Sequence, residues 1–152
     1  MQKITPFLWF DGKAEEAMNF YASIFKNSKV TGLFRTGEGG QVTGGTFQLE
    51  GQEFYVLNGG PQFTFTPAIS FYVSCETQQE IDDLWDKLSA GGEKQRCGWL
   101  KDKYGLSWQI IPTALGKMLG DAKSGNSKKV FEAMLKMEKM DINTLQQAYK
   151  QE

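Results

Sequence analysis

The candidates for general acid-base work in this sequence are Tyr72, Asp102 and Tyr104. A carboxylate or phenol whose pKa is shifted by burial can take a proton from a small carbonyl or aromatic substrate. Each has a plainer alternative. Asp102 precedes the turn at Gly105, where an aspartate more often caps backbone N–H groups, and Tyr72 can be a packed aromatic residue. Tyr72 and Asp102 are the catalytic candidates that the sequence offers.

Histidine is absent from the sequence. Because imidazole is the usual general base near neutral pH and the commonest metal ligand, Ser-His-Asp triads and histidine-based metal sites are excluded. Cys75 and Cys97 lie far apart without CxxC spacing, which favours buried free thiols over a zinc site or a redox dithiol. We therefore predict no metal site and no cofactor.

The length of 152 residues suits one domain with a single well-developed core, which we place at residues 1–152. Because 17 basic side chains stand against 18 acidic ones, no net field favours phosphate or anionic lipid, and neither nucleic acid nor a membrane is an expected partner. The N-terminus lacks the apolar run of a signal peptide, and no segment has the roughly 20 apolar residues of a spanning helix. We expect a cytoplasmic protein.

Apolar periodicity predicts a strand, a helix and three further strands in the first part of the chain, over residues 4–10, 14–25, 29–35, 43–49 and 53–57. The glycine-rich stretch 37–45 predicts a hairpin loop. The order recurs with a strand over 68–74, a helix that begins with the capping box of Thr77 and Glu80, and strands near 93–97, 98–101 and 106–111. Repetition of one unit predicts an α+β fold in which two βαβββ modules, residues 1–62 and 63–113, form a cupped mixed sheet.

Residues 114–152 predict a helical appendage. A helix over 128–140 would have its apolar side chains inward, Asp141 would cap a second helix, and residues 123–127 would form an exposed connection. The inward side chains of the first helix would be Val130, Phe131, Met134 and Leu135. Methionines in this region allow an adaptable surface for a partner, with core packing or a dimer contact as the commoner role; the residues are Met118, Met134, Met137 and Met140, with Leu135.

Several segments resemble the PhnB-like, or demethylubiquinone methyltransferase-like, group of the glyoxalase, bleomycin-resistance and extradiol-dioxygenase superfamily, which shares the vicinal oxygen chelate fold. They are LWFDG at 8–12, LNGG at 57–60, AISF at 68–71 and CGWLKDKYGLSWQ at 97–109. The resemblance implies two βαβββ modules around a cleft, commonly in a homodimer.

The resemblance also assigns positions to metal ligands, on the first and last strand of each module. Those positions hold Thr5 or Pro6, Ala68, Gln109 and an unassigned residue among 54–58. Proline and alanine have no side-chain donor, and metals of this kind prefer imidazole, thiolate or carboxylate, so a tight site is not predicted. A methyltransferase using S-adenosylmethionine is also not predicted, because the sequence lacks a doubly wound parallel pattern and a glycine-rich turn from strand to helix.

Strand alternation determines which side chains face the implied cleft. If Leu8 and Phe10 lie under the first helix, and Ile69, Phe71 and Val73 under the second, the opposite side chains point inward. The predicted ligand-binding residues are Phe7, Trp9, Asn58, Ser70, Tyr72 and Gln109. An aromatic lining with uncharged polar groups suits a small, partly planar organic molecule, although the same aromatics could simply fill the cup.

Two functions are compatible with this lining. The first is metal-independent binding of a small, partly aromatic organic ligand in the sheet cleft, without chemistry. The alternative is a metal-independent enzyme that acts on a small carbonyl or aromatic substrate through Tyr72, Asp102 or Tyr104. The sequence does not choose between them, because fold alone does not determine function.

Overall fold

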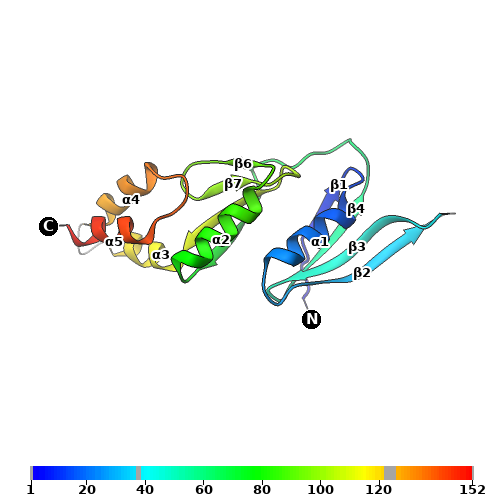
Figure 1. The fold of residues 1–152 in the computed structure, drawn as a ribbon, viewed down its shortest axis with the longest axis horizontal. Helices are drawn as coiled ribbons and strands as arrows, with labels where there is room; N and C mark the ends of the chain where they lie inside the picture. Colours follow the sequence, from blue (N-terminus) through cyan, green and yellow to red (C-terminus); the bar gives the residue numbers. More distant parts are fainter. Residues whose placement is uncertain (1, 37–38, 122–125, 152) are drawn as a thin grey trace. The chain divides into compact units, whose positions relative to one another are not determined.

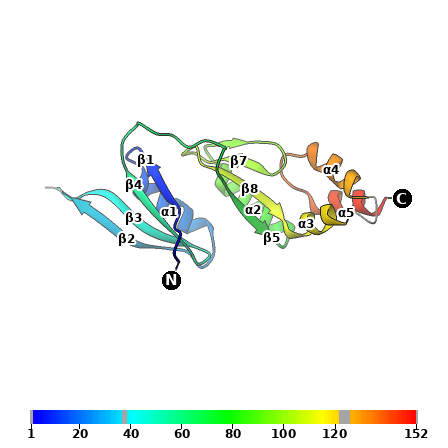
Figure 2. The same cartoon turned by 180° about the vertical axis from the view of Figure 1, so that it is seen from behind.

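The computed structural model describes residues 2–36, 39–121 and 126–151. The chain divides into two compact units, residues 1–65 and 66–152, each built around a four-stranded mixed sheet (Figures 1 and 2). The element order β-α-β-β-β occurs once in each unit, so the predicted pair of βαβββ modules is confirmed. The helical appendage belongs to the second unit.

The first module consists of β1 (Phe7–Phe10), α1 (Ala14–Ile24), β2 (Lys29–Thr36), β3 (Gln41–Leu49) and β4 (Gln52–Asn58). The strand order is β1-β4-β3-β2, with β1 parallel to β4 and the other pairs antiparallel. Gly44 and Gly45, where the predicted hairpin loop 37–45 overlaps the predicted strand 43–49, lie within β3; residues 37–38 of that loop fall outside the described residues. The sheet therefore extends further toward the hairpin than the sequence indicated.

Helix α1 covers one face of this sheet. Ala14, Ala17, Met18 and Tyr21 are buried on its inner side, as the helical spacing predicted. The Tyr21 ring stacks on Phe47 at 6.1 Å between centroids, and Phe47 stacks on Phe54 at 5.0 Å. The burial of Leu8 and Phe10 on the same side leaves the alternate side chains of β1 on the uncovered face.

The predicted strand over 4–10 begins only at Phe7. Before it, the Gln2 side chain replaces strand pairing: its Oε1 accepts from the Glu53 backbone N–H and its Nε2 donates to the Glu53 carbonyl, both at 3.0 Å. The Pro6 carbonyl accepts from the Tyr55 N–H at 2.9 Å, but proline has no N–H to continue the ladder. The Gln2 side chain therefore hydrogen-bonds the backbone of β4 at Glu53, where the backbone before β1 does not.

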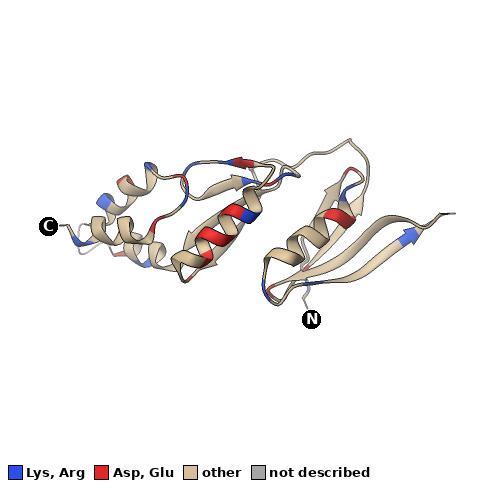
Figure 3. Cartoon of the chain, viewed as in Figure 1, with Lys and Arg blue, Asp and Glu red and all other residues tan. Residues whose placement is uncertain are grey.

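The second module repeats the arrangement with β5 (Ser70–Cys75), α2 (Gln78–Ser89), β6 (Glu93–Lys94), β7 (Trp99–Lys101) and β8 (Ser107–Pro112). Its strand order, β5-β8-β7-β6, is equivalent to that of the first sheet. The Thr77 side chain accepts from the Glu80 N–H, which confirms the predicted cap. Acidic residues lie along the outer side of α2 (Figure 3); they are Glu80, Asp82, Asp83 and Asp86.

Two details of the second module differ from the prediction. Ile69, expected under α2, precedes β5 and is 71% exposed, because the strand starts at Ser70 and not at residue 68. Strand β6 ends at Lys94, since Cys97 and Gly98 adopt φ angles of +61° and +81° and turn the chain. Both cysteines are free thiols; Cys75 is buried, which raises its pKa to about 12, and Cys97 is half-buried.

The appendage contains α3 (Thr113–Gly120), α4 (Ser127–Leu135) and α5 (Ile142–Lys150). Helix α3 was not predicted as a separate element, whereas the Asp141 cap is confirmed by its Oδ1 accepting from the Thr144 N–H. Most of the predicted connection at 123–127 lies outside the described residues. Buried apolar side chains form a small core around these helices: Leu115, Met118, Val130, Met140, Leu145 and Ala148.

The predicted inward face of α4 is partly wrong. Val130 is buried, but Phe131 and Leu135 are 47% and 46% exposed. Helix α4 packs against α3 and α5, and the four apolar positions span a wider arc than these two contacts cover. The helix stops at Leu135 and not at residue 140; beyond it the Met137 and Glu138 carbonyls accept from the N–H groups of Cys97 and Gly98.

In the part of the chain that the structure describes, no helix has both the length and the apolar character needed to cross a membrane.

Candidate functional site

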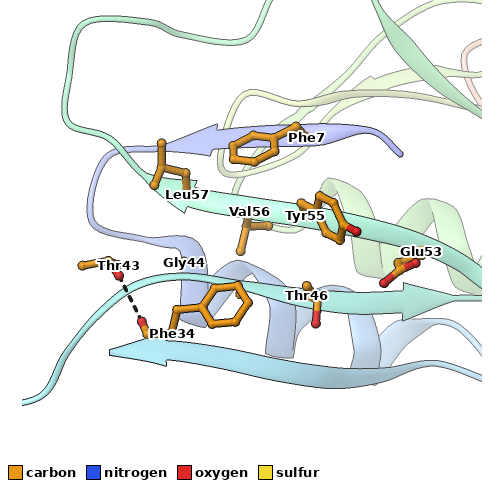
Figure 4. A pocket seen from close by; sticks show the side chains of 10 residues that line it. Phe7, Phe34, Thr43, Gly44, Thr46, Glu53, Tyr55, Val56 and Leu57 are labelled. Atoms are coloured by element: carbon orange, nitrogen blue, oxygen red, sulfur yellow. Dashed lines mark hydrogen bonds between the residues drawn. The ribbon is translucent and has the colours of Figure 1, made fainter. Parts of the chain in front are cut away.

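A concavity of about 420 Å³ lies on the uncovered face of the first sheet (Figure 4). This volume is within the roughly 300–1,000 Å³ typical of sites for small organic molecules. Side chains from all four strands of the module border it: Phe7, Phe34, Thr43, Thr46, Glu53, Tyr55, Val56 and Leu57, with Gly44 and Gly45. The site is thus formed within one module.

Three aromatic rings give the concavity its walls. Phe7 from β1 and Tyr55 from β4 meet edge to face, with centroids 6.3 Å apart, and Phe34 comes from β2. Their exposed fractions are 59%, 38% and 57%, which is high for large aromatic side chains. Exposed rings around a hollow are typical of a surface that another molecule covers.

Gly44 forms the floor between these rings. In the strand register it lies between Phe34 on β2 and Leu57 on β4. An added Cβ would come within 2.6 Å of the Val56 carbonyl oxygen, so β3 tolerates no side chain here. A glycine inside a strand often marks a place where a ligand or another backbone approaches closely.

The polar groups of the concavity differ in whether they already have hydrogen-bond partners within the protein. The Thr43 hydroxyl donates to the Phe34 carbonyl at 3.2 Å, and the Thr46 and Thr31 hydroxyls share a hydrogen bond at 2.6 Å. Glu53 contributes the one carboxylate among the lining residues that the structure describes. Within the described ranges its side chain has neither a hydrogen-bond nor an ion-pair partner.

Of the predicted ligand-binding residues in the first module, Phe7 borders the concavity and the other two make local contacts. The Trp9 indole N–H donates to the Gly60 carbonyl at 2.9 Å, and its ring meets Phe63 edge to face at 5.0 Å. Asn58 accepts from the Ala14 N–H at the start of α1 and donates to the Val42 carbonyl. Trp9 and Asn58 therefore hold loops and the helix start in place.

The predicted residues of the second module share one face of its sheet. Gln109 donates to the Ser70 hydroxyl at 2.9 Å, and Tyr72 is its register partner on β5. Partial burial raises the Tyr72 pKa above its usual value, which moves the phenol further from the range suited to a general base near neutral pH. The structure therefore brings Ser70, Tyr72 and Gln109 together as uncharged polar groups.

Asp102, the second catalytic candidate, is only 2% exposed. Its Oδ1 accepts from the N–H groups of Tyr104 and Leu106 at 2.8 and 3.0 Å, and its Oδ2 accepts from the Trp108 indole N–H at 2.9 Å. A carboxylate enclosed in this way organises the turn and has no open side toward a substrate. Tyr104 belongs to the same turn, with the Lys103 ammonium 5.5 Å from its ring centre.

The donor groups at the family's metal positions do not fit a metal site. Pro6 and Ala68 have no side-chain donor, and the Gln109 amide is hydrogen-bonded to Ser70. Residues 2–36, 39–121 and 126–151 contain no group of three or more His, Cys, Asp or Glu side chains arranged to hold a metal ion.

Sequence reasoning missed most of the concavity. Phe34, Tyr55 and Glu53 were assigned to strands without a role, although Glu53, Tyr55 and Leu57 alternate along β4 and so share a face. The pair Gly44-Gly45, where the predicted loop 37–45 overlaps the predicted strand 43–49, was the clearest available signal, but it was given no role in a site.

Comparisons with known proteins agree with this architecture. A family model described as 3-demethylubiquinone-9 3-methyltransferase matches residues 2–111. A solved structure of a PhnB protein from Bacillus cereus, described as a putative 3-demethylubiquinone-9 3-methyltransferase, is 46% identical; the match covers 74% of this chain and 100% of that chain, with a TM-score of 0.70. No curated protein matches the sequence.

A protein of Pseudomonas aeruginosa shows the same fold at 16% identity, with a TM-score of 0.59 over 73% of this chain and 96% of its own. A glyoxalase/bleomycin resistance protein from Albidiferax ferrireducens also matches, at 12% identity and a TM-score of 0.46 over 69% of this chain and 93% of its own. From the family model and the Bacillus cereus relative, the chain belongs to the PhnB-like 3-demethylubiquinone-9 3-methyltransferase family.

Proposed function

We propose that this protein binds a small, partly aromatic organic ligand, without a metal ion, on the uncovered face of its first sheet. The observation that carries the proposal is the concavity in which Phe7, Phe34 and Tyr55 stand around the bare floor at Gly44. Planar apolar molecules gain from burial against such rings and from edge and face contacts with them.

The family name suggests methyl transfer, but the sheet topology gives that activity no support. Each sheet is a small mixed one, of order β1-β4-β3-β2 or β5-β8-β7-β6. Methyltransferases of the common type bind S-adenosylmethionine at a doubly wound parallel sheet, at a glycine-rich turn that leads into a helix. Binding without chemistry also agrees with the enclosure of Asp102 and the raised pKa of Tyr72.

Phe34→Ala is expected to weaken binding of a planar apolar probe about tenfold, because one aromatic wall of the concavity contributes roughly 1–2 kcal/mol of contact. The probe is 2-naphthalenemethanol, titrated by its own fluorescence and by calorimetry. The Phe34 side chain is already 57% exposed, so the substitution is expected to leave the fold intact, which circular dichroism checks.

Phe131→Ala is the matched control, since it removes a ring of similar exposure, 47%, from α4 in the other unit. Binding of the probe should be unchanged in this variant. Absence of saturable binding to the native protein, or equal losses in the two variants, would contradict the proposal.

We also propose that the chain forms a homodimer, as its family resemblance implies. Exposed apolar side chains support this: Phe63 is 66% and Ile69 71% exposed. Light scattering after size-exclusion chromatography should give about twice the chain mass of 17.1 kDa. The mass of a single chain across the micromolar range would rule the dimer out.

A further inference from the structure

The described side chains that border the concavity include a negative charge and no positive charge. Among the described residues that border it, Glu53 is the only charged one. Arg35, next in sequence to Phe34, is directed elsewhere: its guanidinium lies 3.5 Å from the Glu15 carboxylate on α1 and donates to the Gly40 carbonyl at 2.8 Å. From the described lining, a ligand in this concavity therefore meets a negative charge and no positive one.

The Glu53 carboxylate stands at the end of the concavity bordered by Tyr55 and Thr46 (Figure 4). The Gln2 side chain fixes the backbone of Glu53 on both sides, through the two 3.0 Å hydrogen bonds to its N–H and its carbonyl. Gln2 is thus a positioning residue for Glu53. A carboxylate can only accept hydrogen bonds, and in the described structure this one receives none from the protein.

The other polar groups of the lining include the hydroxyls of Thr43 and Thr46, which carry no charge. The Thr43 hydroxyl donates to the Phe34 carbonyl and the Thr46 hydroxyl shares one hydrogen bond with Thr31, so these two groups offer a ligand at most one free O–H donor. The aromatic rings favour a cation as well, because the face of each ring is negative. The Glu53 carboxylate and the aromatic rings therefore both favour a positively charged ligand.

From this arrangement we propose that the ligand is an organic cation: a protonated amine or similar donor nitrogen attached to a planar apolar body, with the nitrogen at Glu53 and the body against Phe7, Phe34 and Tyr55. This inference rests on the proposed function and adds the charge of the ligand to it. The specificity-determining residue is Glu53.

The test uses three probes with the same ring system: 2-naphthylmethylammonium, 2-naphthalenemethanol and 2-naphthoate. Their dissociation constants are measured by calorimetry at pH 7 in low salt. We expect the cation to bind roughly fivefold to tenfold more tightly than the neutral alcohol, and the anion more weakly than either. Added salt should reduce the preference, because Glu53 is partly exposed and its charge is screened.

Glu53→Gln should remove the preference for the cation while leaving the affinity for the alcohol within twofold. Glu16→Gln is the matched control: it makes the same change of charge on α1, which covers the opposite face of the sheet, and it should leave all three affinities unchanged. Circular dichroism and thermal unfolding check that both variants are folded.

Equal binding of the three probes, tighter binding of the anion, or a preference that persists in Glu53→Gln would overturn this inference. If the alcohol still binds and still responds to Phe34→Ala, the proposed function survives that outcome. Failure of all three probes to bind would reject the ligand charge and the proposed site together.

Discussion

Asp102→Ala is expected to lower the free energy of unfolding by roughly 3–5 kcal/mol. The substitution removes the acceptor of three donors, the N–H groups of Tyr104 and Leu106 and the indole N–H of Trp108. Each donor left buried without a partner costs about 1–3 kcal/mol, and the turn that leads into β8 loses its organising side chain. Urea denaturation followed by tryptophan fluorescence measures the change.

Two further variants test whether the loss comes from the hydrogen bonds of Asp102. One keeps part of these bonds without the charge, and the other removes a carboxylate at an exposed position. Asp102→Asn can still accept from the two backbone N–H groups, but it sets an amide donor against the Trp108 indole donor; we expect a loss of about 2 kcal/mol. Asp83→Ala removes an exposed carboxylate on α2 and should change stability by less than about 0.5 kcal/mol. If Asp102→Ala were no worse than Asp83→Ala, the structural role of Asp102 would be wrong and a catalytic role would return.

Met140→Ala is the second variant with a large expected effect, a loss of about 3 kcal/mol. The Met140 side chain is fully buried where the appendage meets the second module, so close to Gly98 that an added Cβ there would lie 3.1 Å from Met140 Cγ. Truncation of a fully buried methionine leaves a cavity and typically costs roughly 2–5 kcal/mol. Urea denaturation again provides the measurement.

Leu135→Ala is the control for this variant, because it removes a similar side chain that is 46% exposed in the same appendage. Its expected loss is below about 1 kcal/mol. Met140→Ala should also speed hydrogen exchange at the N–H groups of Cys97 and Gly98, which donate to Met137 and Glu138 at 2.9 and 2.8 Å. Equal stability of the two variants would show that the appendage is not integral to the second module.

The appendage matters because it lies beyond the region shared with the family. The family model ends at residue 111, and the Bacillus cereus relative is fully covered by 74% of this chain. Yet the added helices are tied to the second module at several points. The Gln78 amide donates to the Met140 carbonyl and accepts from the Ile142 N–H, and Lys139 pairs with Asp82 at 3.0 Å. Met118 and Met140 serve as core residues, which is the commoner of the two roles that the sequence allowed.

Most of the architecture could be predicted from local patterns. The buried faces of α1 and α2 follow from helical spacing, and the caps at Thr77 and Asp141 follow from short-range hydrogen bonds that involve neighbouring residues only. The repeated βαβββ order needs no knowledge of long-range contacts, because each turn and each period is encoded locally.

The predictions that failed depend on contacts between distant segments. Phe131 and Leu135 have the spacing of buried residues, but α4 has neighbours over only part of its circumference. Strand β1 starts late because Gln2 occupies the hydrogen-bonding groups of Glu53, 51 residues away. No window of sequence around α4 contains that information; around β1 the local sequence shows that Pro6 lacks an N–H, but not that Gln2 takes over the pairing with Glu53.

The same division applies to the candidate site. The sequence by itself determined the two modules, the helices that cover one face of each sheet, the absence of histidine and the aromatic character of the uncovered strands. Only the tertiary structure decided which side chains border the concavity. The register of β2, β3 and β4 places Phe34, Gly44 and Leu57 in one row. Strand register is a pairing between segments far apart in the chain, and a shift of one residue would have turned these side chains to the opposite face.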